Sequence, residues 1–184
     1  MKTFERLYKR DPKICAVIPV SPAAHEVIKT ATKDWHVPHI LVTEDKDKFP
    51  ALKGCVAALA ASGTVTLELA LLGIPMVVGY IMHPITIWLG RLFVKTKFIS
   101  LPNILLGDKY VTELIQEECK PGMLFSELDK LVSNKKAADK QKKAFKGLQS
   151  LLTSDKGAAS EIVTDKILDL IVEFNTEFDS QEVV

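Results

Sequence analysis

The sequence has few of the residues on which disulfide-rich and zinc-binding domains depend. Three of its 184 residues are cysteine, and Cys15, Cys55 and Cys119 lie far apart with no C-x-x-C spacing. A disulfide framework and a cysteine zinc site are therefore not supported. The sequence also contains no G-x-S-x-G, Walker, G-x-G-x-x-G or H-E-x-x-H motif. A hydrolase, a kinase or a dehydrogenase thus has no supporting motif, and we expect neither a metal nor a cofactor.

The sequence lacks a surplus of either charge. Its 24 basic and 23 acidic residues give a formal net charge of +1. A nucleic-acid-binding protein would show a dominant basic face or tail, so nucleic acid is not an expected partner. Acidic residues are missing locally: none lies between residues 69 and 107, where Arg91, Lys95 and Lys97 are found. We expect this segment to be attracted to anionic surfaces.

No apolar run has the form of a signal peptide or a membrane span. Residues 14–20 are apolar, but they are few and follow a charged segment. Residues 69–90 carry no formal charge, yet Gly73, Pro75 and Pro84 interrupt them. Because lipid does not tolerate irregular exposed backbone, we reject a membrane span there. We expect a cytoplasmic protein with at most a peripheral contact to the membrane.

Short apolar runs alternate with helical patterns along the first two thirds of the chain. Strands are predicted at residues 14–20, 39–42, 55–61, 76–80 and 98–101, helices at 22–32, 64–72 and 85–93, and a loop at 44–48. This alternation predicts an α/β fold, Rossmann-like, with a parallel sheet covered by helices on both faces. Further helices are predicted at residues 123–132, 136–152 and 158–174. We therefore divide the chain into an α/β domain, residues 1–120, and a C-terminal helical segment, residues 121–184, packed on it.

The most informative stretch begins where the strand at residues 55–61 ends. Ser62, Gly63 and Thr64 are small residues at the point where a helix should start. The free N–H groups and positive dipole end of that helix would hold a phosphate. Glu68 lies about one turn further on, where a carboxylate can accept hydrogen bonds from two ribose hydroxyls. The alternative is that Ser62 or Thr64 is only an N-cap and Glu68 only a solvated helix residue.

Two further polar residues follow predicted strands. His83 comes after the strand at residues 76–80, and the carboxyl ends of strands are where α/β sheets bind ligands. Asn103 follows Pro102 beyond the strand at residues 98–101. Its amide offers donors and an acceptor to a ligand, or it forms a simple Asx turn.

These segments together closely resemble the lipid-A-disaccharide synthase family. The matching motifs are Ser62-Gly63-Thr64 with Glu68, Gly-Ile-Pro-Met-Val-Val-Gly-Tyr at residues 73–80, Pro-Ile-Thr-Ile-Trp at 84–88, Ser-Leu-Pro-Asn at 100–103 and Leu-Ile-Gln-Glu-Glu-Cys at 114–119. The resemblance runs from about residue 14 to residues 157–161. It implies the C-terminal, donor-binding domain of a GT-B glycosyltransferase, truncated at its N-terminal edge.

The resemblance also implies a reaction and its partners. A UDP-2,3-diacylglucosamine donor would be joined to 2,3-diacylglucosamine 1-phosphate with release of UDP, on the inner face of the inner membrane. The general base would lie in an N-terminal acceptor half, which we expect this chain to lack. Three alternatives stay open. The chain is one half of a split enzyme, completed by a separate N-terminal chain or by a homo-oligomer. Otherwise it is a non-catalytic nucleotide-sugar or lipid-binding remnant, or a gene fragment with no independent activity.

The match adds residues to the expected donor site. Asn103 gains support as a ligand contact, and Gln116 and Glu117 are placed at the same rim. Adjacent helical residues point about 100° apart, so spacing leaves open which of the two faces the donor. Ile81 stands where the family commonly has a basic residue. His83 or Arg91 would then have to serve the diphosphate.

The predicted helix at residues 85–93 has one apolar face. Core packing is the default explanation for such a face. However, Arg91, Lys95 and Lys97 lie on or just beyond this helix in the acid-free region, and Trp88 is part of the apolar face. Since the family's substrates are acylated, we expect these four residues to contact the membrane or lipid.

Overall fold

The computed structural model describes residues 1–81 and 97–152, without the side chains of Gln149 and Leu152. His83, Trp88, Arg91 and Lys95, with the helices predicted at residues 85–93 and 158–174, lie outside the described residues. Among the described residues, no helix has both the length and the apolar character that a membrane crossing requires.

Two parallel sheets form the centre of the described structure. β1 (Ala16–Pro19) pairs with β2 (His39–Val42) in one sheet. β3 (Ala58–Ala60), β4 (Met76–Tyr80) and β5 (Thr112–Ile115) form the other sheet, in that order. The α/β architecture with parallel strands is therefore confirmed.

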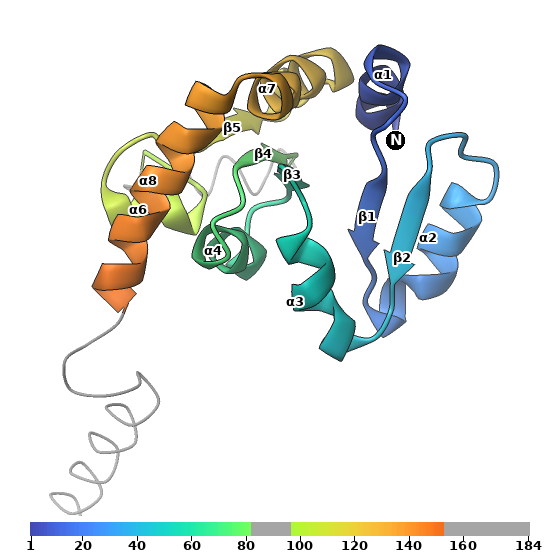
Figure 1. Ribbon diagram of the computed structural model, residues 1–184, viewed down its shortest axis with the longest axis horizontal. Helices are drawn as coiled ribbons and strands as arrows, with labels where there is room; N and C mark the ends of the chain where they lie inside the picture. The colour runs from blue at the N-terminus through green and yellow to red at the C-terminus, as the bar shows by residue number, and fades with distance from the viewer. Residues whose placement is uncertain (82–96, 153–184) are drawn as a thin grey trace, which may run out of the picture.

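The helices pack around these sheets (Figure 1). Their bounds are α1 (Lys2–Arg10), η1 (Pro22–Ala24), α2 (His25–Thr32), α3 (Asp45–Lys53), α4 (Thr64–Leu71), α6 (Leu101–Leu106), η2 (Gln116–Glu118), α7 (Pro121–Ser133) and α8 (Lys135–Leu152). α1 lies beside α7, and α4, α6 and α8 contact one another.

Strand β4 separates two apolar cores because successive side chains of a strand point to opposite faces. Met76 and Val78 are fully buried in the core that α4, α6 and α8 share. Val77, between them, is buried in the core formed with α1 and α7. Helices thus cover both faces of the β3–β4–β5 sheet, as the continuous apolar pattern of β4 predicts.

Helix α4 ends in a Schellman motif. Gly73 has φ +70°, and its N–H donates to Ala70 O while the Ile74 N–H donates to Leu69 O. Both hydrogen bonds satisfy carbonyl groups at the end of the helix, and glycine tolerates the left-handed backbone. The predicted helix at residues 64–72 is confirmed to within one residue.

Two local predictions were wrong, and one strand was not predicted. The predicted loop at residues 44–48 contains the first turn of α3, which Asp45 and Asp47 favour through the helix dipole. Residues 98–101 form no strand: Leu101 begins α6, and Pro102 suits the first turn of a helix. The strand that was not predicted is β5, which directly precedes the Gln-Glu-Glu segment.

Candidate donor-binding site

The β3–β4–β5 sheet brings distant predicted site residues to one edge. Its register places Ala60 beside Val78 and Tyr80 beside Ile115. The turn at residues 62–64 therefore follows β3 at the same edge at which residues 116–117 follow β5. Carboxyl ends of parallel strands are the usual ligand edge of an α/β sheet.

Gly63 is the residue at which α4 begins. Its backbone has φ +145° and ψ −170°, a conformation that is essentially restricted to glycine. The Gly63 carbonyl accepts from the Thr66 N–H at 3.1 Å and from the Thr66 hydroxyl at 2.7 Å. The N-cap residue is Gly63, and no side chain of the described residues caps the helix. Neither Ser62 nor Thr64 therefore has the capping role offered as the alternative. The N–H groups of Thr64 and Val65, which precede that of Thr66, have no partner within the helix and can face a ligand or water.

Ser62 connects the turn after β3 to the segment that precedes α6. Its hydroxyl donates to the Ile99 carbonyl at 2.7 Å. The Ile99 and Ser100 N–H groups in turn donate to the Glu113 carboxylate of β5, at 3.1 and 2.9 Å. Ser62 therefore positions the turn in this structure, rather than presenting a free hydroxyl to a donor.

Asn103 is fully buried in α6 and its amide is used inside the protein. Nδ2 donates to Val111 O and to Glu113 Oε1, both at 2.9 Å. Oδ1 accepts from the N–H groups of Tyr110 and Val111, at 2.9 and 2.8 Å. The side chain thus joins α6 to β5, a larger structural role than an Asx turn. Its contact with the donor stays a prediction, for which the amide would have to leave these partners.

Glu113 is a residue that sequence reasoning missed. It lies in the middle of β5 and is 8% exposed. Besides the two backbone donors, its Oε1 accepts from the Ser100 hydroxyl at 2.6 Å. An acidic residue inside an apolar strand was the available signal, since a buried carboxylate must have hydrogen-bond donors.

Glu68 lies one turn inside α4 and forms an ion pair. Its Oε2 is 2.7 Å from Lys48 Nζ, and the two side chains are 31% and 29% exposed. Glu68 is therefore a half-buried, paired carboxylate, not a merely solvated residue. Lys48, from α3, is the second residue that sequence reasoning missed. Its position beside α4 depends on how β2 and β3 are placed, which no local pattern gives.

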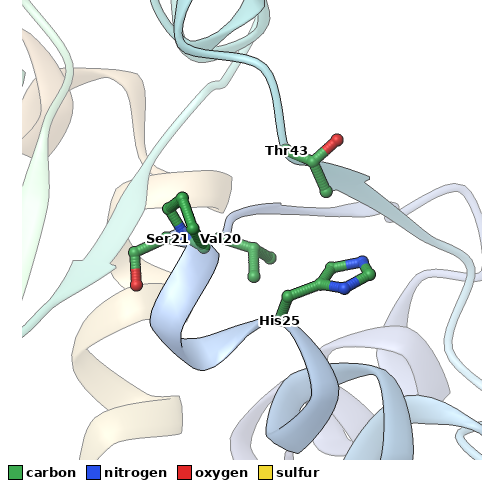
Figure 2. A pocket seen from close by; sticks show the side chains of 5 residues that line it. Val20, Ser21, His25 and Thr43 are labelled. Atoms are coloured by element: carbon green, nitrogen blue, oxygen red, sulfur yellow. The ribbon is translucent and has the colours of Figure 1, made fainter.

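A groove lies at the carboxyl ends of β1 and β2. One part, of about 330 Å³, is lined by Val20, Ser21, Pro22, His25 and Thr43. Figure 2 shows the side chains of Val20, Ser21, His25 and Thr43 in this lining. A second part, of about 260 Å³, shares Val20, Ser21 and Thr43 and extends to Lys48 and Val65. Since Val65 is in the first turn of α4, the groove leads to the start of that helix.

Gln116 and Glu117 begin the short helix after β5. Gln116 is half-buried and has φ +52°, which is uncommon for a residue other than glycine. Glu117 is exposed, and so is Lys97. The contact of Gln116 and Glu117 with a donor stays a prediction.

Within the described part of the chain, no cluster of His, Cys, Asp and Glu side chains could hold a metal ion.

Burial, with a smaller contribution from Cys15, raises the pKa of the Cys55 thiol. Cys55 precedes β3 and therefore lies at the end of the strand opposite to the turn at residues 62–64.

Comparison with known proteins places most of the chain within one family. A family model described as lipid-A-disaccharide synthetase matches residues 1–167. The chain is 40% identical to the lipid-A-disaccharide synthase of Rhodospirillum centenum over 76% of the chain and 35% of that relative. Identity to the enzyme of Gluconobacter oxydans is 34%, over 94% of the chain and 41% of the relative. The chain is 36% identical to the lipid-A-disaccharide synthase of Klebsiella pneumoniae, over 92% of the chain and 44% of that relative. The chain thus spans less than half the length of these relatives.

Proposed function

The chain belongs to the lipid-A-disaccharide synthase family, glycosyltransferases of lipid A biosynthesis, and we propose that it forms the donor-binding half of such an enzyme. The donor is UDP-2,3-diacylglucosamine, the acceptor is 2,3-diacylglucosamine 1-phosphate, and UDP is released. The observation that carries this proposal is the start of α4 at Gly63, on the ligand edge of the sheet.

The start of α4 suits the diphosphate of the donor. Within the described part of the chain no side chain caps the helix, so its first N–H groups and its positive dipole end can face an anion. As the bond between the sugar and the diphosphate breaks, negative charge grows on the departing UDP. Fixed N–H donors at that position stabilise the charge without having to reorganise.

Glu68 and the groove suit the nucleoside. One helical turn rises about 5.4 Å, so Glu68 is placed to accept hydrogen bonds from ribose hydroxyls while the diphosphate lies at Gly63. The groove lined by Val65, Lys48 and Thr43 continues from there. In this proposal it receives the uracil base.

The acceptor site and the general base belong, in this proposal, to the part of the relatives that the chain does not match. They would come from linked sequence, from a separate N-terminal chain, or from a second copy. The protein would work on the cytoplasmic face of the inner membrane, where residues 85–97 meet anionic lipid. A nucleotide-sugar-binding module without chemistry is the second candidate, because the described features, the start of α4 and the Glu68 carboxylate, suit binding.

Titration calorimetry with UDP tests the proposal. The purified chain should bind UDP weakly and prefer it to ADP. Gly63→Ala should lower the affinity by about tenfold, because a backbone strain of ~1–3 kcal/mol disturbs the first turn of α4. Gly147→Ala is the matched control: it lies in α8, and an added Cβ meets nothing within 4 Å. A folded chain that binds no UDP would contradict the proposal.

A further inference from the structure

We propose that Lys48 is a positioning residue of the donor site, which holds the Glu68 carboxylate for the ribose hydroxyls and offsets its charge beside the diphosphate. The inference rests on the proposed function and deepens it. It starts from one contact: Lys48 Nζ lies 2.7 Å from Glu68 Oε2.

The choice of partner indicates that the pair is more than a surface contact. From Thr43 to Pro50 every residue except Lys48 is exposed. Glu44, four residues before Lys48, is the partner that a solvated lysine near the start of a helix would ordinarily find. Lys48 instead reaches an acid twenty positions further along the chain, with less than a third of either side chain exposed.

The location of the pair connects it to ligand binding. Lys48 lines the groove together with Val65 from the first turn of α4. The ion pair therefore links α3, which follows β2, to the helix whose start is the proposed phosphate site. Without the Lys48 ammonium, the Glu68 side chain would be able to adopt several rotamers.

The chemistry of the pair suits a ribose contact. Lys48 contacts Oε2, so Oε1 is the oxygen that the pair does not use and that can accept from a hydroxyl. A carboxylate near a diphosphate is repelled unless a cation compensates it. Lys48 supplies that cation without occupying the start of α4.

The test compares two nucleotides and three variants by calorimetry. UDP carries both ribose hydroxyls, and 2′,3′-dideoxy-UDP carries neither. Lys48→Met should weaken UDP binding about tenfold, since hydrogen bonds to charged groups are strong, and should weaken dideoxy-UDP binding several-fold less, because only the groove contact of Lys48 is then lost. Lys48→Arg should restore most of the UDP affinity. Lys46→Met, an exposed neighbour on the same helix, should bind both nucleotides as the parent does.

Each other outcome has a definite meaning. Unchanged UDP affinity in Lys48→Met overturns the positioning role, as does an equal loss for both nucleotides, which would indicate a direct phosphate contact or a disturbed fold. A melting curve for every variant separates the last two. If the parent chain binds no UDP, the proposed function fails and this inference fails with it.

Discussion

Two carboxylates near the ligand edge have different surroundings and therefore different expected roles. Glu113 is enclosed and accepts from three groups of Ile99 and Ser100 as well as from Asn103. Glu68 is half-buried and pairs with Lys48. We expect substitution of Glu113 to act on the fold and substitution of Glu68 to act on ligand binding.

Glu68→Gln should weaken UDP binding without unfolding the chain. An amide replaces a carboxylate that accepts from two hydroxyls, which costs on the order of 1.5–3 kcal/mol. Calorimetry measures the affinity, and circular dichroism checks the fold. An unchanged affinity in a folded variant would show that Glu68 does not contact the ribose.

Asn103→Ala should destabilise the protein. The substitution removes the side-chain partner of the Tyr110 and Val111 N–H groups and of the Val111 carbonyl, at about 2–4 kcal/mol in total. Urea denaturation measures the loss. Asn134→Ala is the control, because Asn134 is exposed and accepts only from N–H groups at the start of α8, a loss of ~1 kcal/mol. If Asn103→Ala were as stable as the control and bound UDP poorly, the ligand contact would be supported.

Among the elements, α1 illustrates how a charged segment can be part of the core. Its sequence is Lys-Thr-Phe-Glu-Arg-Leu-Tyr-Lys-Arg, yet Leu7 is 2% exposed and packs in the core shared with α7. Leu7→Ala should destabilise the chain by about 2–5 kcal/mol, because the cavity fills only partly. Leu151→Ala is the control, with a side chain 65% exposed. Equal thermal stability of both variants would show that α1 does not pack as described.

The segment at residues 85–97 should bind anionic membranes. Each basic residue near the surface contributes roughly 1 kcal/mol, and salt screens the attraction. In vesicle co-sedimentation, the chain should sediment with anionic vesicles at low salt and dissociate from them at high salt. A variant with alanine at positions 91, 95 and 97 should bind less. Equal binding in all conditions, or none, would leave the segment with a packing role.

At the scale of the whole molecule, the chain alone should not synthesise the disaccharide. Reaction requires both substrates to be aligned and water to be excluded, which a donor half cannot do by itself. An assay of the purified chain with both substrates should give no product, whereas a full-length relative should give product. Robust synthesis by the chain alone would contradict the expectation. Activity that returns when an acceptor half is added would identify a split enzyme.

The sequence by itself determined the elements whose pattern is local. β2 and β4 match the predicted strands at residues 39–42 and 76–80, and α4 begins at the predicted Thr64. Apolar runs, Gly63 and Gly73 act through the backbone near them, so one sequence is enough to find them. The resemblance to the family also depended on such local motifs, and the comparisons confirm it.

Only the tertiary structure decided which side chains meet. Lys48 of α3 pairs with Glu68 of α4, and Ser62 reaches Ile99, 37 positions away. The predicted strand at residues 98–101 was wrong because the Ile99 and Ser100 N–H groups bond to the Glu113 carboxylate, not to a neighbouring strand. Asn103 is likewise held by groups that α6 and β5 bring together. These contacts depend on the relative placement of elements, and hydrophobic periodicity carries no information about that placement.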